Sequence, residues 1–363
     1  MKNTHQKSFV GIIFLILITL SINIYAKENK NSDVIPVTMA NFIHADSIRA
    51  YLKELDQAKN QVNFIRSNRI FPNTDNQDVI RMNSDTLYTK FILDVKDGAT
   101  VTTKPYDGYQ NIMVLDPNHS EIATLTGSGT IKLDETMLTD GHHAFVIVRT
   151  GLLRDLSKKE MFHRAHKAQD NISITYNSSQ SYTPSVNYDF TTLNQVKYKI
   201  LEDFIKYPQK DVIKNGFGTT KTRDKKAARV VIAIGWGGLS GKNAVYSSFN
   251  SNKERCSFTI NKPNLHYEKK GFFSVTIYNA DGYIATMNYA INSEDMIPNK
   301  DDTYTINFLA SGEPIKNGEK NILRTPRGKI WTGVIRAYYP KDKDETFTWA
   351  DKLTAQMTKA FMQ

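Results

Sequence analysis

Three polar side chains that alternate along one short segment are the clearest candidates for chemistry in this sequence. Arg81, Asn83 and Asp85 are spaced two residues apart, and in an extended chain such residues leave the same face of the backbone. A guanidinium, an amide and a carboxylate on one face suit a polar ligand, and they equally suit an internal hydrogen-bond network that anchors a loop before a strand. We favour the structural interpretation, with Asp85 as the partner of Arg81. Tyr88 and Arg336 fit either arrangement.

His119 is the second candidate, because it follows an Asp-Pro-Asn turn after an expected strand, where loops often carry sites. A metal held by His119 with Asp85 or His142 is one alternative. Zinc sites need three or four close ligands, however, and the sequence shows no diagnostic spacing. The pair His142-His143 lies in a turn, where solvated side chains are the simpler interpretation. We therefore assign no metal and no cofactor.

Other chemistry-bearing residues have an ordinary structural interpretation. Cys256, the only cysteine, lies in a strand-like run and is expected to be a core or half-buried thiol. Trp236, between glycines, is either core or part of a sugar-stacking surface, and aromatic residues in a sandwich are more often core. Its aromatic companions would be Phe272, Phe273, Tyr278 and Tyr283. The Gly-x-Ser-x-Gly, His-Glu-x-x-His and Walker motifs are absent, which leaves only a dispersed enzymatic site open.

The elements that must position these residues change character along the chain. Apolar residues first recur at helical spacing and predict a helix over 46–65, with Asp46 as its N-cap. From Thr86 the apolar period becomes two, which is typical of strands. The strands predicted in this half span 86–94, 100–103, 110–115, 130–133 and 144–149. A helix capped by Ser157 is predicted over 156–169.

A second β-rich half follows a Ser-, Asn- and Thr-rich stretch over 171–188. Helices are predicted over 193–207 and 225–234, and the Gly235-Trp236-Gly237-Gly238 cluster ends the second. The strands predicted in this half span 257–260, 272–278, 304–308 and 333–339. Short strands separated by Gly and Asp turns are typical of sandwiches and barrels.

The amino-terminal residues predict export. Lys2 and Lys7 accompany an apolar run of roughly a dozen residues, shorter than the about 20 that cross a membrane, and Ala26 supplies a small residue for cleavage. We expect residues 1–26 to be a signal peptide and the mature chain to lack a transmembrane segment. An uncleaved N-terminal anchor is the alternative.

The formal net charge of +10 is carried by lysines spread along the chain. Such a charge favours solubility and non-specific attraction to polyanions. No recognition motif accompanies it, so we do not expect nucleic acid as a partner.

The octapeptide Arg81-Met82-Asn83-Ser84-Asp85-Thr86-Leu87-Tyr88 resembles a bacterial exported family, domain of unknown function 1254, whose members carry an R-x-N-x-D-T-x-Y element before their first strands. Asp116-Pro117-Asn118-His119 and a His-x-x-Gln-Asp helix at 166–170 extend the similarity. The second half is similar to the companion domain of unknown function 1214, in the glycine cluster at 235–238, in 271–279 and in 336–340.

This resemblance implies two jelly-roll-like β-sandwich domains with helical additions, export in many members, and no established reaction. The chain departs from the family pattern in three places: Ser120-Glu121-Ile122-Ala123-Thr124 replaces an aromatic-rich stretch, Phe273 replaces a tryptophan, and Met287-Asn288 replaces an Asn-Pro pair. Any pocket lined by these residues would be altered.

We therefore expect a mainly β protein with accessory helices, built from two jelly-roll-like β-sandwich domains. The expected division is a signal peptide (1–26), a leader (27–45), an N-terminal domain (46–170), a connecting segment with helices (171–234), a C-terminal domain (235–350) and a tail (351–363).

The expected function is that of an exported envelope or secreted protein, periplasmic or extracellular, that binds or has a structural role. Its partner would be a polar or anionic small molecule or an envelope polymer, and the oligomeric state is left open. The alternative is a hydrolase with a dispersed site around Arg81, Asp85 and His119. The candidate binding residues are Arg81, Asn83, Asp85, Tyr88, His119 and Arg336. A cleft that gathers Arg81, Asp85 and His119 would favour the hydrolase, and burial with mutual satisfaction would favour binding.

Overall fold

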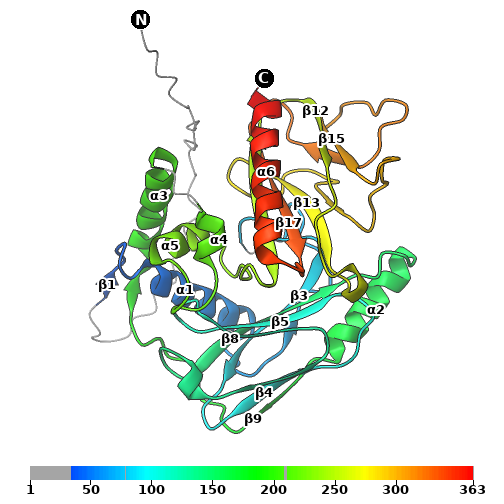
Figure 1. The fold of residues 1–363 in the computed structure, drawn as a ribbon. Helices are drawn as coiled ribbons and strands as arrows, with labels where there is room; N and C mark the ends of the chain where they lie inside the picture. The colour runs from blue at the N-terminus through cyan, green and yellow to red at the C-terminus, as the bar shows by residue number, and fades with distance from the viewer. Residues whose placement is uncertain (1–33, 78, 208–210, 363) are drawn as a thin grey trace, which may run out of the picture.

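A computed structural model describes residues 34–77, 79–207 and 211–362, and Figure 1 shows them as two strand-rich halves flanked by helices. The expected signal peptide (1–26) and the leader up to residue 33 lie outside the described residues. The expected class, mainly β with accessory helices, is confirmed. The jelly-roll topology stays a prediction.

The amino-terminal half is a sandwich of two antiparallel sheets. The larger sheet has the order β2-β3-β8-β5-β6 and the smaller one the order β7-β4-β9. Their bounds are β2 Arg66–Ser67, β3 Thr86–Asp94, β4 Ala99–Thr103, β5 Gln110–Leu115, β6 Glu121–Thr126, β7 Gly129–Leu133, β8 His143–Gly151 and β9 Ser173–Tyr176. Helix α2 (Lys158–Asp170) begins after the predicted cap, Ser157, whose side chain accepts a hydrogen bond from the Glu160 amide.

The larger sheet is buried on both faces, which positions the cavity described below. Alternate residues of a strand point to opposite faces, so Val146 and Val148 of β8 fill the sandwich interior. Phe145 and Ile147 point the other way and pack with helix α1 (Phe42–Gln57) and with the carboxy-terminal half. The outer face of this sheet is thus an internal surface of the whole molecule.

The carboxy-terminal half has a four-stranded sheet, β11-β17-β13-β14, opposite a three-stranded sheet, β12-β15-β16. Their bounds are β11 Ala244–Ser251, β12 Arg255–Ile260, β13 Phe272–Asn279, β14 Ala290–Asn292, β15 Tyr304–Ala310, β16 Ile322–Thr325 and β17 Trp331–Tyr338. The shared core includes Phe249, Phe308 and Trp331, and helix α6 (Lys343–Met362) packs Leu353, Met357 and Phe361 against it.

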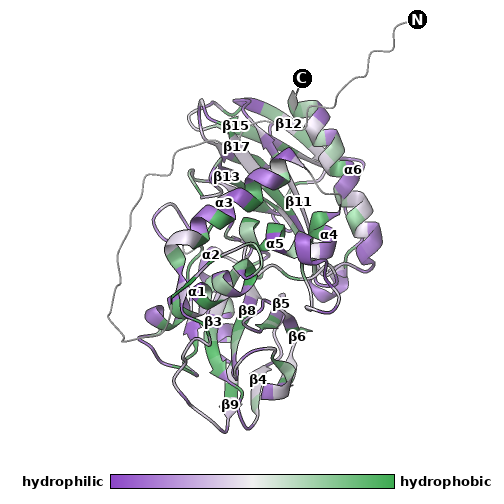
Figure 2. Ribbon diagram, turned by 90° about the vertical axis from the view of Figure 1, so that its left-hand side faces the viewer, coloured by the Kyte–Doolittle hydropathy of each residue, from purple (hydrophilic) through white to green (hydrophobic). Residues whose placement is uncertain are grey.

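The halves are joined by the paired strands β1 (Ile35–Pro36) and β10 (Tyr188–Asp189) and by helices α3 (Phe190–Lys206), α4 (Val212–Gly216) and α5 (Lys225–Ile234). Helices α1, α3 and α5 share one apolar cluster. In Figure 2 they lie at the level between the two groups of strands.

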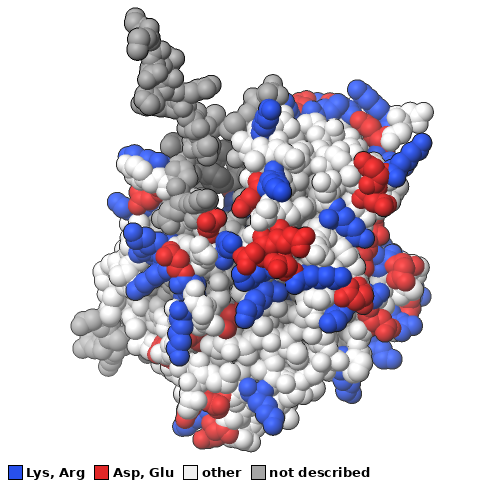
Figure 3. Space-filling view, in the orientation of Figure 1, with Lys and Arg blue, Asp and Glu red and all other residues white. Residues whose placement is uncertain are grey.

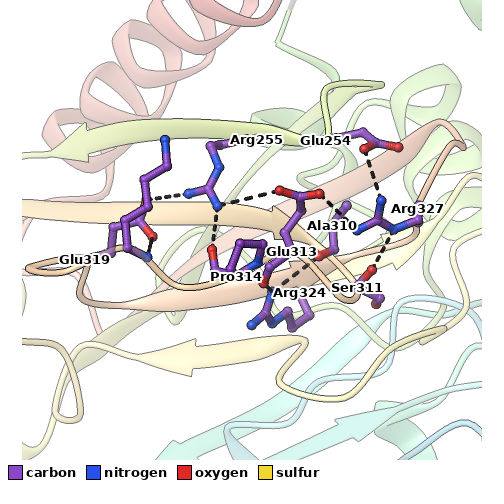
Figure 4. A network of polar contacts seen from close by, with 10 residues as sticks. Glu254, Arg255, Ala310, Ser311, Glu313, Pro314, Glu319, Arg324 and Arg327 are labelled. Atoms are coloured by element: carbon purple, nitrogen blue, oxygen red, sulfur yellow. Dashed lines mark hydrogen bonds and ion pairs between the residues drawn. The ribbon is translucent and has the colours of Figure 1, made fainter.

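Much of the positive charge is balanced locally. On the three-stranded sheet, Arg255 pairs with Glu319 at 2.5 Å and Arg327 with Glu313 at 2.9 Å, in the network of Figure 4. Figure 3 shows cations and carboxylates interspersed on one face of the molecule. Partly exposed surface pairs of this kind contribute only about 0–1 kcal/mol each to stability. Their main effect is to keep positive and negative charges mixed on the surface.

The structure corrects several predicted elements. The first helix starts at Phe42, so Asp46 is an interior residue that pairs with Arg49 and is not an N-cap. This helix ends at Gln57, because Lys59 and Asn60 take left-handed φ values of 54° and 59°. Residues 351–362, expected to form a tail, belong to α6.

No helix in the described ranges has both the length and the apolar character needed to cross a membrane.

We predict that α6 is an integral part of the carboxy-terminal core. Leu353 is buried on the helix, whereas its neighbour Lys352 is exposed. Leu353→Ala should lower the free energy of unfolding by about 2–5 kcal/mol, measured by urea denaturation. Lys352→Ala is the control and should change it by no more than about 0.5 kcal/mol. Equal effects of the two substitutions would contradict the prediction.

Candidate functional site

A cavity of about 210 Å³ lies where the outer faces of the two larger sheets meet. Its walls come from strands β3 and β8 of the first half and β11 and β17 of the second, and α1, the 79–83 loop and the 234–238 segment close its sides. The strand residues that line it are Tyr88, Lys90, Phe145, Ile147, Arg149, Tyr246, Ser247, Ser248, Val334, Arg336 and Tyr338. The site therefore depends on both halves.

Strand alternation explains which residues reach the cavity. On β8, Phe145, Ile147 and Arg149 share the face opposite to the sandwich interior. On β17, Arg336 and Tyr338 alternate with Ile335 and Ala337, which are core residues. Each of these two strands thus places an arginine in the cavity wall.

Arg149 is the most unusual residue of the site. Its side chain is 4% exposed, one Nη donates to the Gly237 carbonyl at 2.6 Å, and the guanidinium carbon lies 5.5 Å from the centre of the Tyr88 ring. The other Nη is buried without a hydrogen-bond partner among the described residues, and no carboxylate there forms an ion pair with Arg149. A buried cation in this state has unused hydrogen-bonding capacity facing the cavity.

Arg81 and Arg336 are two further cations at the same cavity. Arg81 donates to the Ile234 carbonyl at 2.9 Å, and its buried Nε has no partner among the described residues. Arg336 donates to the Arg81 carbonyl at 2.8 Å and to the Tyr278 hydroxyl at 2.9 Å. Burial, and then the neighbouring Arg336, lowers the pKa of Arg81.

Among the described residues, Glu54 is the one carboxylate in the cavity wall, and it is already paired. Glu54 accepts two hydrogen bonds from Arg66, at 2.7 and 2.6 Å, and lies 3.6 Å from the Lys90 ammonium group. In the described part of the chain, the arginines on β8, on β17 and in the 79–83 loop line the cavity without an ion-paired carboxylate.

The glycine cluster after α5 forms the wall beside Arg149. Gly237 has a left-handed φ of 79°, and a Cβ there would lie 3.2 Å from the end of Ile147. Its amide donates to Nε2 of His119 at 2.9 Å, and its carbonyl accepts from Arg149. His119 and Arg149 thus hydrogen-bond to the amide and the carbonyl of the same residue, Gly237. These two hydrogen bonds fix the neighbouring Trp236 in the cavity wall.

His119 itself is a buried structural residue. It has a left-handed φ of 56° in the Asp116–Ser120 turn, where the Asp116 carboxylate accepts from the Asn118 and Ser120 amides at 2.9 and 2.7 Å. Because Nε2 accepts from Gly237, Nδ1 carries the proton. Burial, and then nearby Arg223, lowers the pKa of His119 to about 3, so it is neutral at pH 7 and its lone pair is occupied.

Asn83 and Asp85 join the halves. Asn83 donates to the Tyr338 hydroxyl at 2.7 Å, and the Ser274 hydroxyl donates to Asp85 at 2.6 Å. Burial raises the pKa of Asp85, while Arg336 and the Ser274 hydrogen bond act in the opposite direction. The nearby cation is thus Arg336, not Arg81 as expected from the sequence.

The candidate residues consequently divide into two groups. Arg81, Asn83, Tyr88 and Arg336 line the cavity, whereas Asp85 and His119 do not. The expected hydrolase set of Arg81, Asp85 and His119 is therefore not gathered around one cavity. Sequence reasoning missed Arg149, although an arginine directly after the apolar run Val146-Ile147-Val148 was a usable signal.

The other aromatic and thiol predictions have mixed outcomes. Trp236 lines the cavity, but its expected companions Phe272, Phe273 and Tyr278 are buried and Tyr283 is exposed. Cys256 is half-buried, as expected, and burial raises the pKa of its thiol to about 11.

Comparison with known families agrees with this division into halves. A family model described as "Protein of unknown function (DUF1254)" matches residues 62–139, and one described as "Protein of unknown function (DUF1214)" matches residues 245–342. The fold and cavity define a two-part β protein with a site between its parts. The first part is thus similar to the DUF1254 family and the second to the DUF1214 family, in that order along the chain.

Solved structures support the fold alone. The VPA0106 protein from Vibrio parahaemolyticus is 14% identical, with a TM-score of 0.62 over 85% of this chain and 94% of that protein. An uncharacterized protein from Burkholderia cenocepacia is 13% identical, with a TM-score of 0.48 over 83% of this chain and 84% of the other. No curated protein matches the sequence.

We predict that Asp85 stabilises the junction between the halves. Asp85→Ala would remove the buried acceptor of the Ser274 hydroxyl, and leaving a buried donor unsatisfied costs about 1–3 kcal/mol. Thermal melts and urea denaturation would measure the loss. Asp107→Ala, at an exposed carboxylate, is the control. An unchanged or raised Tm for Asp85→Ala would contradict the structural role.

We further predict that His119 makes the protein acid-sensitive. Its pKa is about 3 in the folded protein and about 6.5 without burial, so between these pH values only the unfolded state binds the proton. The free energy of unfolding should then fall, as pH decreases, by up to about 1.4 kcal/mol per pH unit from this group. His119→Gln keeps an acceptor for Gly237 and removes the proton site, so its slope from pH 6 to pH 4 should be shallower. Equal slopes would count against the assignment.

Proposed function

We propose that the protein binds a small organic anion, an aromatic monocarboxylate, in the cavity between its two halves. The observation that carries this proposal is the buried guanidinium of Arg149, which lines the cavity with one Nη unpartnered and without an ion pair among the residues that the structure describes. Leaving a buried charged donor unsatisfied costs about 1–3 kcal/mol or more. A carboxylate ligand would remove this penalty and neutralise part of the excess charge.

The shape and lining of the cavity favour a molecule with one ring. In other proteins a cavity of about 150 Å³ takes up benzene, and this one measures about 210 Å³. That volume suits a single ring with an acid group better than a segment of an envelope polymer. The apolar side chains available to the ring include Phe145, Ile147, Phe217, Ile234, Trp236 and Val334.

The charged groups favour a carboxylate over a neutral polar ligand. Arg149 and Arg81 each hold one buried N–H without a partner in the described chain, and neither can lose its charge at neutral pH. Hydrogen bonds to charged groups are worth about 1.5–3 kcal/mol each.

We also propose that binding takes place after export, in the periplasm or outside the cell. The support is the order of basic, apolar and small residues over 1–26. Such a protein would collect small organic acids where they first meet the cell.

We predict that benzoate binds at least tenfold more tightly than benzamide, because only the acid satisfies Arg149. Isothermal titration calorimetry of the purified protein would measure both affinities, and benzoate should raise the Tm. Arg149→Met retains apolar volume without the guanidinium and should lose at least about tenfold in benzoate affinity, equal to about 1.4 kcal/mol.

Arg164→Met is the matched control, because Arg164 is exposed on α2 and lies outside the cavity. It should bind benzoate as the parent does. Equal affinity for benzoate and benzamide, or equal losses in the two variants, would overturn the proposed function.

A further inference from the structure

A second group of polar residues lies at the opposite end of strand β8 from Arg149. Asp94 ends β3, His143 begins β8, and the antiparallel register pairs these two residues directly. His142 precedes His143, and the two imidazole centres are 4.3 Å apart. The sequence predicted solvated histidines here, but His143 is buried, with 4% exposure, because its ring packs against Tyr182.

The three side chains converge. One ligand atom of each, a carboxylate oxygen or an imidazole nitrogen, lies within 4.8 Å of the other two. Nε2 of His142 is 3.9 Å from the nearer Asp94 oxygen, Oδ1. This nitrogen is buried and has no hydrogen-bond partner among the described residues. Its hydrogen-bonding capacity is thus unused at the centre of the group.

The surroundings prepare His143 to act as a ligand. Its Nε2 lies 2.8 Å from the Gln180 carbonyl oxygen, and a carbonyl can only accept, so Nε2 carries the proton. Nδ1 of the neutral ring then holds a free lone pair. Metal-binding histidines usually donate their other ring N–H to a carbonyl or carboxylate in this way, which fixes the ring and its tautomer.

Asp94 is fixed in the same manner. Its Oδ2 accepts from the Ser178 hydroxyl at 2.6 Å and the Gln180 amide at 2.7 Å. Among the described residues, Oδ1 accepts only from the Lys96 amide, at 3.0 Å. Oδ1, the oxygen nearer His142, retains capacity for another partner. The 178–180 segment therefore orients both Asp94 and His143.

We propose that Asp94, His142 and His143 bind a divalent transition metal ion, with Zn²⁺ as the best match. Two imidazole nitrogens and one carboxylate oxygen suit zinc, whereas calcium and magnesium prefer oxygen ligands only. Zinc–ligand bonds of about 2.0–2.2 Å require the three atoms to draw closer than their present spacing. His142, with 28% of its side chain exposed, is the least enclosed of the three and can make this adjustment.

Titration of the purified protein with Zn²⁺, followed by calorimetry, tests the site. One equivalent should bind, and Co²⁺ in its place should give the visible absorption of a site with nitrogen and oxygen ligands. Loss of a group that only orients a ligand costs about 10–100-fold in metal affinity, so Ser178→Ala should fall in that range. His142→Ala, which removes a ligand, should weaken binding by more than Ser178→Ala does.

His163→Ala is the matched control, because His163 is exposed on α2 and pairs only with Glu160 in the described chain. It should leave the affinity unchanged. The proposal is overturned if no equivalent of Zn²⁺ binds, or if His142→Ala and His163→Ala have the same effect. Arg149→Met should retain the metal, so failure of the anion site and failure of the metal site can be told apart.

Discussion

The guanidinium of Arg149, buried without an ion pair among the described residues, is the constraint on which the cavity between the halves depends. The penalty for taking an unpaired charge out of water is several kcal/mol, and the Gly237 carbonyl and the Tyr88 ring offset part of it. Arg149 remains buried because two sheets and the glycine cluster enclose it. Among the described residues, the resulting cavity combines apolar walls with arginines that have no ion-paired carboxylate.

The segment from Arg81 to Asp85 connects this site to the stability of the junction. The Arg81 carbonyl accepts a hydrogen bond from Arg336. Asn83 donates a hydrogen bond to the Tyr338 hydroxyl, and Asp85 accepts one from the Ser274 hydroxyl. The polar side chains of the most family-like octapeptide are thus shared between both halves. The structural interpretation and the ligand interpretation apply to different residues of one motif: Asp85 is internal, whereas Arg81 faces the cavity.

Strand β8 carries both proposed sites on one rigid element. Arg149 lies near its carboxyl end, and His143 begins it. Strand β3 pairs with β8 along its whole length, and β5 pairs with residues 145–150, so both ends of β8 are held within the sheet. Sites on such elements are positioned more accurately than sites on loops.

The local pattern of the sequence determined the strands with alternating apolar residues, and β3 and β5 begin and end where the pattern predicts. It also determined the α5 helix, whose apolar face and flanking Asp224 and glycines are local signals. It did not reveal α6, β11 or Asp94 with His142 and His143, since these depend on partners far away in the chain. The partner of Asp85, the burial of His119 and the exposure of Arg149 to a cavity were decided by tertiary structure. Only the approach of two sheet faces determines which polar side chains are paired and which are left facing an enclosed space.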